Sequence, residues 1–533
     1  MESISAMKIL LLLCLCLLVN GLQAQNNKII PQPNQQTVEK GQFNLSGVTP
    51  LITRDLSFNS AAEYLQAELL KTVGITLARK EELNGAAIVF TRDNSLGPEA
   101  YKLQITEIAV IISAGTDAGA FYGVISLLQL IRQATVQNQS LVLPALTLAD
   151  APRYGWRGIL LDESRHFFGK TAVKKMLDWM AFYKFNRFHW HLTDEPGWRL
   201  EIRKFPRLAL VGGVGSYSNS QDMTKFYTQE DIKEIIYYAQ KRHITIIPEI
   251  DMPGHASAAN RAYPEFSGGG SQGYPDFTFH PGKDETYSFL TRILKETDVL
   301  FPSQMIHLGG DEVHFGNEKW KTDPSVRRLM KRHNLLDLPA VENYFIRRMA
   351  DSLFSINNKI LLWDEAVDSQ LPIDKTIIFW WRHDQPNQLK KAMEKGFPTV
   401  LTPRIPFYLD FMQDSTQQVG RKWGSAFSPI ESIYSFSVKS LPVSTVQESL
   451  ILGIQGALWT ENISTESRLE YMLFPRIAAL SETAWTQEKS KILSDFMNRM
   501  KSHLRLYKQE GVYYYNPFDP KRTPEPLDRF ELK

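Results

Sequence analysis

The sequence predicts an α/β protein in which a small α+β domain precedes a (β/α)8 barrel of the TIM type. Three observations lead to this prediction. The chain has 533 residues, which is too long for one ordinary domain. From about residue 151 onward, short apolar runs typical of buried strands alternate with patterns typical of amphipathic helices. About eight such runs occur, and strands and helices alternating in this number favour a (β/α) barrel.

The first 24 residues are expected to be a processing segment that is not part of the fold. Lys8 precedes an apolar run from Ile9 to Val19, and Ala24 ends an approximate small-residue cleavage site. The run is too short to span a bilayer, so we expect a secretory signal peptide, cut after Ala24, and export to a periplasm or the outside. Met1 and Met7 are both possible start sites.

Composition excludes several classes of function. Both cysteines, Cys14 and Cys16, lie in the processing segment, so the mature chain has no disulfide, thiolate metal site or cysteine nucleophile. The net charge of +2 gives no reason to expect a nucleic-acid or membrane-surface partner. No other stretch is long and apolar enough to cross a membrane. Aromatic residues are plentiful, and their flat apolar faces suit sugar rings as well as a core.

Residues 25–150 are expected to form the small α+β domain. Ala86–Thr91 has a strand pattern, and residues 61–71 and 118–131 have helical patterns. No catalytic constellation occurs here, so we expect a structural role. Pro152 marks the boundary with the barrel.

The barrel is expected over residues 151–488. One helical stripe runs from Val173 to Ala181, and Thr228 with Asp231 three residues later is a capping-box pattern at the start of another helix. The expected strands are Gly158–Leu161, Phe188–Leu192, Ile244–Ile250, Met305–Leu308, Ile360–Trp363, Ile377–Trp381, Thr399–Leu401 and Leu452–Leu458.

Polar and aromatic side chains follow these strands in turn. The active sites of such barrels lie at the carboxyl ends of the strands, so a ring of such residues predicts one site there. The residues are Asp162, Arg165, His189, His191, Asp194, Glu249, Asp251, His255, Asp311, Glu312, Trp363, Asp364, Trp381, Arg382, Tyr408, Asp410, Trp459 and Glu461.

The fourth expected strand runs into His307-Leu308-Gly309-Gly310-Asp311-Glu312. Glycines allow a close approach of the backbone, and burying two adjacent acids costs free energy unless a site uses them. An isolated pair of this kind would be interpreted as a surface turn. Its place in the ring of polar strand ends favours a functional site instead.

The segment 489–533 carries a helical stripe from Ile492 to Leu504 and a Pro-rich polar tail from Asn516. We expect a helix packed on the barrel and an extended end, with no function of their own.

Six segments carry a pattern that is more specific than the strand ends. They are Trp156-Arg157-Gly158, Asp162–Phe167, His189–Asp194, Gly197-Trp198-Arg199, Pro248–His255 and His307–Glu312. In this order they resemble glycoside hydrolase family 20, the β-N-acetylhexosaminidases. The resemblance extends from Ile29-Ile30-Pro31-Gln32-Pro33 to Phe474-Pro475-Arg476. The family usually has Asp-Gln where this chain has Glu195-Pro196, so no role is assigned to Glu195.

The resemblance implies an exo-acting glycosidase that removes terminal β-linked GlcNAc or GalNAc from glycans with retention at the anomeric carbon. Most glycosidases place two carboxyl groups roughly 5 Å or more apart on either side of the bond, which adjacent residues cannot easily do. Members of this family are a substrate-assisted exception, in which the 2-acetamido oxygen of the substrate attacks and gives an oxazolinium intermediate. No cofactor and no metal are implied.

Roles carry over from the family by position. Glu312 resembles the acid/base and Asp311 the partner of the acetamido group, and we expect Asp311 to stay ionised while Glu312 is protonated. Residues resembling substrate-binding groups are Arg165, Trp363, Trp381, Tyr408, Asp410, Trp459 and Glu461, with Trp423 at the rim. Those resembling a supporting shell are Asp194, Asp251, His255 and His307.

Three alternatives are left open. A metal-dependent hydrolase would use His189 and His191, whose side chains lie on the same side of a strand, with His255, His307 and Asp311. A non-catalytic glycan-binding protein would keep the fold without the chemistry, although the intact carboxylate pair argues against it. An enzyme that releases a disaccharide such as lacto-N-biose would need a roomier pocket.

Overall fold

The computed structural model describes residues 28–82, 85–137, 139–356 and 358–527. The expected signal peptide lies outside these residues. Their contacts divide the chain into two units, one made of the residues up to Pro152 together with Lys489–Leu506, the other of Arg153–Glu488 together with the residues from Tyr507. Among the described residues, no helix combines the length and apolarity needed to cross a membrane.

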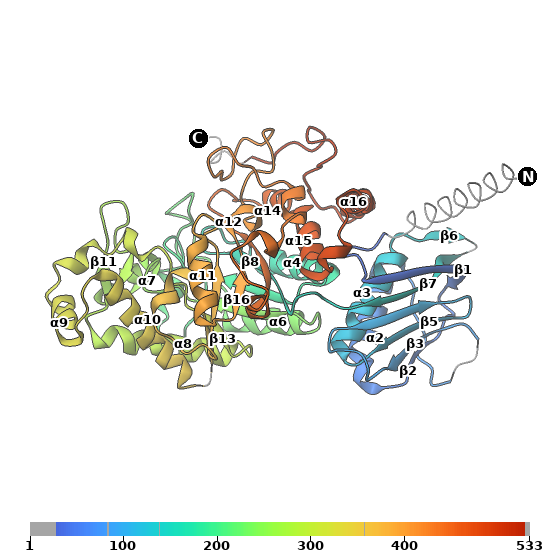
Figure 1. Cartoon of the computed structure of the whole chain (residues 1–533), viewed down its shortest axis with the longest axis horizontal. Coiled ribbons are helices and arrows are strands. Elements are labelled where there is room, and N and C mark those ends of the chain that lie inside the picture. The colour runs from blue at the N-terminus through green and yellow to red at the C-terminus, as the bar shows by residue number, and fades with distance from the viewer. Residues whose placement is uncertain (1–27, 83–84, 138, 357, 528–533) are drawn as a thin grey trace, which may run out of the picture. The chain divides into compact units, whose positions relative to one another are not determined.

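The first unit is built on a mixed sheet with the order β1-β7-β4-β5-β3-β2, in which β6 also pairs with β7. Helices α2 and α3 pack on each other and on this sheet (Figure 1). Thr116 caps α3 by accepting the Gly119 N–H. The bounds are β1 Gln35–Leu45, β2 Leu51–Thr53, α2 Asn59–Val73, β3 Ala87–Arg92, β4 Tyr101–Ile105, β5 Ala109–Ala114, α3 Asp117–Ile131, β6 Thr135–Gln137 and β7 Ser140–Asp150.

Helix α16, Leu493–Gln509, differs from the expected packing on the barrel, because residues 489–506 group with the first unit. Its Arg499 donates to the carbonyl oxygen of Ile29 at 2.9 Å, and His503 Nε2 lies 2.9 Å from that of Lys28. Of the residues after Glu488, those from Tyr507 onward group with the barrel.

The second unit is a closed barrel of eight parallel strands, surrounded by helices (Figure 1). Its strands are β8 Trp156–Asp162, β9 Arg187–His191, β10 Thr245–Glu249, β13 Met305–His307, β14 Lys359–Trp363, β15 Thr376–Trp380, β16 Thr399–Leu401 and β17 Ile451–Leu458. The (β/α)8 prediction is therefore confirmed. The barrel interior is filled by side chains that include Trp156, Leu160, Ile247, Leu361 and Phe379.

The helices follow the strands in the expected alternation, with one exception. Between β14 and β15 the chain forms only a 3-10 helix, Asp364–Asp368, because so few residues connect the two strands. The capping box predicted at Thr228 and Asp231 opens α6. The helices are α4 Lys170–Phe182, α5 Arg207–Leu210, α6 Gln229–Gln240, α7 Ser257–Ala262, α8 Asp284–Leu300, α9 Pro324–His333, α10 Leu338–Phe354, α11 Pro386–Lys395, α12 Arg404–Phe407, α13 Ile430–Tyr434, α14 Glu466–Leu473 and α15 Arg476–Trp485, and a small ribbon is formed by β11 Ser267–Gly269 and β12 Thr278–Phe279.

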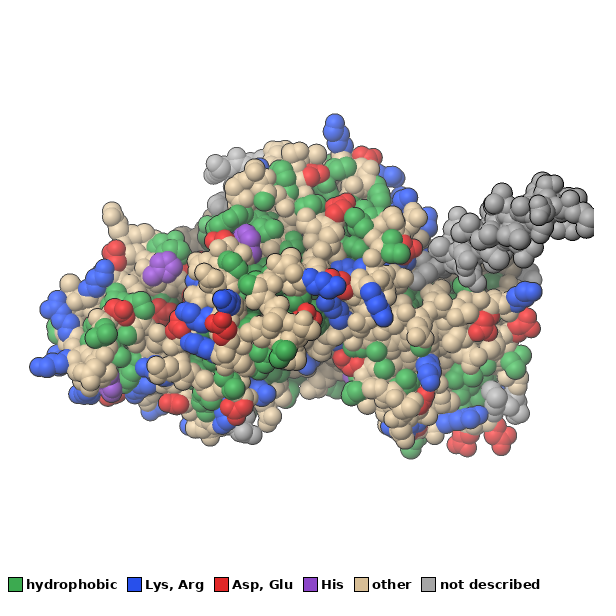
Figure 2. Space-filling model, viewed as in Figure 1, with side chains coloured by type: hydrophobic (Ala, Val, Ile, Leu, Met, Phe, Trp, Pro, Cys, Tyr) green, Lys and Arg blue, Asp and Glu red, His purple; other side chains and the backbone are tan. Residues whose placement is uncertain are grey.

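Charged side chains of both signs share the surface. On the face drawn in Figure 2, Lys and Arg are interspersed with Asp and Glu among the described residues. This distribution agrees with the net charge of +2.

Candidate active site

The turn after β13 delivers two adjacent carboxyl groups to the mouth of the barrel. Gly309, Gly310 and Glu312 have φ values of +66°, +86° and +53°, so most of this turn lies in the left-handed region. A Cβ atom on Gly309 would lie 1.8 Å from Oδ1 of Asp251, so only glycine fits there. That carboxylate also accepts the Gly310 N–H at 3.3 Å. Asp251 therefore supports the turn that presents Asp311 and Glu312.

Both carboxyl groups line one pocket, together with residues from the ends of several strands. The lining residues are Arg165, His191, Asp194, His255, Asp311, Glu312, Trp363, Trp381, Arg404, Tyr408, Arg421, Trp459 and Glu461. Most of the residues predicted from the sequence thus meet around one space. Asp251, His307 and Asp410 are buried and do not line it.

A buried imidazole connects the carboxyl pair to Asp194. His255 Nδ1 lies 3.0 Å from Asp194 Oδ1, while its Nε2 lies 3.7 Å from Asp311 Oδ2 and 3.8 Å from Glu312 Oε2. Burial acts to lower the pKa of His255, but the charges of Asp194 and Asp251 outweigh it and hold that pKa well above its usual value. The imidazole is therefore a cation among carboxyl groups. Glu195, which was assigned no role, also lies within 3.5 Å of His255 Nδ1.

Asp311 is the more deeply placed member of the pair, with a side chain 14% exposed against 32% for Glu312. Burial raises the pKa of Asp311 to about 7, His255 opposes the increase, and the charges of Glu365 and Glu312 add to it. Burial thus acts against the expected ionisation of Asp311 in the free protein. Full ionisation requires either a higher pH or a positive charge close to the carboxylate.

Arg165 lines the pocket and is held in place by carboxylates. Its Nη1 lies 2.6 Å from Asp194 Oδ2 and 3.5 Å from Asp162 Oδ2, and its guanidinium carbon lies 5.3 Å from the ring centroid of Trp459. The planar fork is thereby fixed, which suits it for directed hydrogen bonds to a ligand.

Glu461 lines the pocket, and the buried carboxyl group of Asp410 contacts the same arginine, Arg421, so the two acids form a second acidic end of the site. Neither oxygen of Asp410, nor Oε2 of Glu461, has a hydrogen-bond partner among the described residues. Burial raises the pKa of Asp410 to about 7. Burial also acts to raise the pKa of Glu461, but Arg165 and Arg421 outweigh it and lower the value. Buried acceptors without partners are expected where a ligand supplies the donors.

Aromatic side chains form the walls. The rings of Trp363 and Trp459 lie 6.0 Å apart between centroids, and Tyr408 lies 6.0 Å from Trp459. Trp381 is parallel to Tyr408 with centroids 6.2 Å apart, and its Nε1–H donates to Glu365 at 3.1 Å. The walls are apolar and rigid, as a sugar ring with an acetamido methyl group requires.

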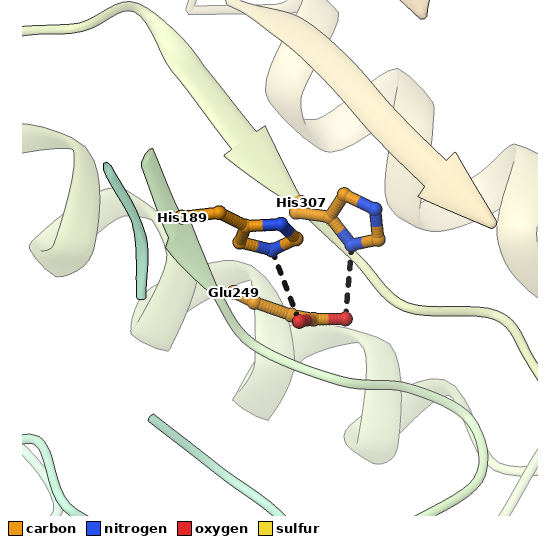
Figure 3. A group of neighbouring side chains, drawn as sticks. All are labelled: His189, Glu249 and His307. Atoms are coloured by element: carbon orange, nitrogen blue, oxygen red, sulfur yellow. Dashed lines mark ion pairs between the residues drawn. The ribbon is translucent and has the colours of Figure 1, made fainter. Parts of the chain in front are cut away.

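Glu249 is the buried centre of the layer beneath the pocket. Its Oε2 lies 2.6 Å from His191 Nδ1, and its Oε1 accepts the Trp363 indole N–H at 2.9 Å. Figure 3 shows the carboxylate between two further imidazoles, with His189 Nε2 and His307 Nδ1 each 3.0 Å away. His307, expected beside Asp311 and Glu312, thus contacts Glu249. The layer fixes Trp363 directly, and it fixes Asp194 through His191.

The atoms of His189, Glu249 and His307 lie close enough together to hold one metal ion. The amide nitrogen of Gln455 lies 3.0 Å from Nδ1 of His189, and the amide oxygen of Gln455 accepts from Trp156. This orientation leaves the hydrogen of His189 on Nε2, which lies 3.0 Å from Oε2 of Glu249. Burial lowers the pKa of His189 to about 4, so the imidazole is neutral. The carboxylate is thus satisfied by N–H donors of the chain itself.

Several residues of the site were missing from the predicted set. Glu249, which ends β10, is in the predicted ring but without a role, whereas Glu365 follows β14 and is not in the ring. Glu342 lies on α10, and burial, aided by the charges of Glu365 and Asp311, raises its pKa to about 8. Both Arg404 and Arg421 follow β16. Arg404 begins the short helix α12 and Arg421 lies in an irregular segment, and no sequence period points to a pocket at either position.

Comparisons with known proteins cover most of the described chain. The model of the glycosyl hydrolase family 20 catalytic domain matches residues 154–488, and that of the family 20 domain 2 matches residues 26–151. A β-hexosaminidase of Porphyromonas gingivalis is 32% identical over 92% of this chain, which spans 64% of that relative's length.

Solved structures give the same result. An exo-β-N-acetylglucosaminidase of Vibrio harveyi in complex with N-acetylglucosamine has a TM-score of 0.86 at 32% identity, over 93% of this chain and 79% of that one. A β-N-acetylhexosaminidase of Bacteroides fragilis has a TM-score of 0.83 at 32% identity, over 94% and 99% of the two chains. One family model covers the barrel and the other the smaller unit, and the likenesses to relatives extend over both. The chain therefore belongs to glycosyl hydrolase family 20.

Proposed function

We propose that this protein is an exo-acting β-N-acetylhexosaminidase that removes terminal β-linked GlcNAc or GalNAc from glycans by a retaining, substrate-assisted mechanism. The observation that carries the proposal is the adjacent pair Asp311 and Glu312 on one left-handed turn, facing a pocket walled by tryptophans. Neighbours in sequence cannot flank a sugar carbon as a separate nucleophile and acid do.

In the first step Glu312 gives its proton to the glycosidic oxygen, and the acetamido carbonyl oxygen of the substrate attacks the anomeric carbon. The bond to the leaving group breaks and an oxazolinium forms. Asp311 accepts the acetamido N–H and stabilises the positive charge. The Glu312 carboxylate then takes a proton from the water that attacks the anomeric carbon from the face opposite the acetamido oxygen. The bond between that carbon and the acetamido oxygen breaks, which regenerates the acetamido group and leaves the sugar in the β configuration.

The surrounding residues serve this chemistry. The cationic imidazole of His255 faces both carboxyl groups. The aromatic walls exclude water, and Arg165, Asp410 and Glu461 are available for the outer hydroxyls. The developing oxazolinium also supplies the positive charge that favours ionised Asp311, whose pKa burial raises to about 7 in the free protein.

The test is hydrolysis of aryl β-N-acetylglucosaminide and β-N-acetylgalactosaminide, with the first-formed anomer identified by NMR. We expect the β anomer first. Glu312→Gln should lower turnover on the order of 10²–10⁴-fold with a poor leaving group, and much less with an activated phenolate, which needs little protonation. An equal loss of turnover for both leaving groups would contradict the assignment of Glu312 as the general acid.

A metal-dependent hydrolase is the second candidate, because His189, Glu249 and His307 could surround an ion. It requires a bound metal in stoichiometric amount and loss of activity on chelation. For the proposed function we expect full activity after dialysis against a chelator.

We also propose that the protein is exported, on the basis of the apolar run near its amino terminus. Detection of a mature chain beginning at Gln25 outside the cytoplasm would test this.

A further inference from the structure

The acidic end of the pocket is covered by one arginine. A guanidinium nitrogen of Arg421 donates to Oε1 of Glu461, and Nε of Arg421 lies 3.5 Å from Oδ2 of Asp410. The two carboxylates are 9% and 2% exposed, whereas the arginine side chain is 49% exposed. Arg421 therefore lies on the solvent side of this acidic end, and the two carboxylates lie beneath it.

The loop that carries Arg421 is tied to the segment of Asp410. The Arg421 N–H donates to the Asp410 carbonyl oxygen at 3.2 Å, and the Met412 N–H donates back to the Arg421 carbonyl oxygen at 3.0 Å. Gly420 has a φ of +135°, and a Cβ atom on it would lie 3.1 Å from the Asp410 carbonyl oxygen. These backbone contacts thus fix the position of Arg421 beside Asp410.

The C-terminal tail fixes the other side of this loop. Glu525 accepts the backbone N–H groups of Gln418 at 2.5 Å and of Val419 at 3.2 Å. Arg468 donates to Glu525 at 3.0 Å and to the Val419 carbonyl oxygen at 2.8 Å. The side chains of Glu525 and Arg468 are 5% and 0% exposed, so the ion pair between them is buried, and both side chains also hydrogen-bond to the backbone of the loop.

A second contact joins the same two segments. The Tyr515 hydroxyl in the tail donates to the carboxylate of Asp414, which lies in the loop. Glu525 and Tyr515 therefore hold the loop at two points, one on each side of Gln417. All these residues belong to the barrel unit.

We propose that Arg421 closes the outer end of the sugar pocket and restricts it to one terminal sugar, and that Glu525 of the C-terminal tail positions Arg421 for this role. This inference rests on the proposed function. A sugar extended at this end would have to displace a guanidinium from two buried carboxylates. Leaving those carboxylates unpaired is costly, so the extended ligand is rejected.

The test for Arg421 compares two aryl β-glycosides, one of GlcNAc and one of a disaccharide with GlcNAc at the scissile bond and galactose on its outer end. The quantity measured is the kcat/KM for the disaccharide divided by that for the monosaccharide. Arg421→Ala should raise this ratio by about tenfold or more, since it loses the charge-assisted hydrogen bond to Glu461 and the ion pair with Asp410 at the closed end. An unchanged ratio would overturn the role of Arg421.

The test for Glu525 uses Glu525→Ala and the milder Glu525→Gln, with Asp519→Asn, an exposed acid of the same tail, as the matched control. Both Glu525 variants should raise the ratio in the wild-type background, and neither should raise it further in Arg421→Ala, whereas the control should leave it unchanged. A purely structural role would instead lower both kcat/KM values together. If the Glu525 substitutions raised the ratio equally in the wild-type and Arg421→Ala backgrounds, the inference that Glu525 acts by positioning Arg421 would be wrong.

Hydrogen exchange provides a readout that needs no catalysis. The amides of Gln418 and Val419, which donate to Glu525, should exchange about tenfold faster or more in Glu525→Ala than in the control. Unchanged exchange at both amides would overturn the tail contact. If the wild-type protein released no sugar while these amides responded, the proposed function would fail and the tail contact would stand.

Discussion

At the scale of single residues, the site depends on how differently two neighbouring acids are placed. Asp311 is the more buried of the two, and burial raises its pKa to about 7. Asp251, the carboxyl group under the turn, also has its pKa raised well above its usual value, first by burial and then by the charge of Asp311. The turn therefore concentrates acidic groups at a cost to stability, as functional sites often do.

Asp311→Asn should show this cost directly. Turnover of aryl GlcNAc is expected to fall on the order of 10²-fold or more, because the anion that balances the oxazolinium is gone. The melting temperature at pH 8 should rise, because the variant no longer ionises a buried group beside Asp251. Calorimetry and steady-state kinetics on the same preparation check both. Near wild-type turnover would contradict the role of Asp311.

At the scale of elements, the barrel strands could be predicted within one or two residues at each end. Thr399–Leu401 was predicted with its observed bounds, and the expected strand 305–308 is β13 with one residue fewer. Buried parallel strands are continuous apolar runs, and a charged or aromatic residue marks where most of them end. Local pattern was therefore sufficient for the elements and for the ring of strand-end residues.

Residues that reach the pocket from irregular segments could not be predicted in this way. Arg421 is placed by backbone pairing with Asp410 and by Glu525, which is far away in the sequence. Helix α16 shows the same limit, since its apolar stripe predicts a helix but does not say which unit it packs on. Long-range packing decides both, and no periodicity records it.

The turn after β13 makes a prediction at this scale. Gly309→Ala should lower stability and abolish most activity, because alanine is disfavoured at φ +66° and its Cβ would overlap Asp251. Gly74→Ala is the matched control, with φ +69° and no atom within 4 Å of the added Cβ. It should cost about 1 kcal/mol from backbone strain alone. Equal free energies of unfolding for the two variants would contradict the close approach of Asp251.

At the scale of the whole molecule, several carboxyl groups in the barrel unit have raised pKa values. Burial is the first cause for each, and it raises the pKa of Glu163, Asp311 and Asp410 to about 7 and that of Glu342 to about 8. In an unfolded chain such groups titrate near 4. Between these values the folded protein binds more protons than the unfolded chain does.

Stability should therefore decrease as pH rises from about 5 to 8, the window between the unfolded and folded pKa values. The raised pKa of His255 acts in the same direction, since its stabilising charge is lost as pH rises. Carboxyl groups with lowered pKa, such as Glu461, are already ionised throughout this window. The lowered pKa of His189 opposes the trend only below the unfolded imidazole pKa of about 6.5. Scanning calorimetry from pH 5.5 to 8.5 should show a falling melting temperature, with a shallower slope in Asp410→Asn. A melting temperature that rises with pH would contradict these assignments.

The central claim is that the nucleophile belongs to the substrate, with Asp311 guiding it and Glu312 moving the proton. It is tested most directly by kcat/KM for aryl GlcNAc derivatives whose N-acetyl group carries zero, one, two or three fluorine atoms. Fluorine weakens the carbonyl oxygen as a nucleophile and adds little bulk. A steep stepwise decrease in kcat/KM across the series is predicted, and equal values for all four substrates would contradict the account.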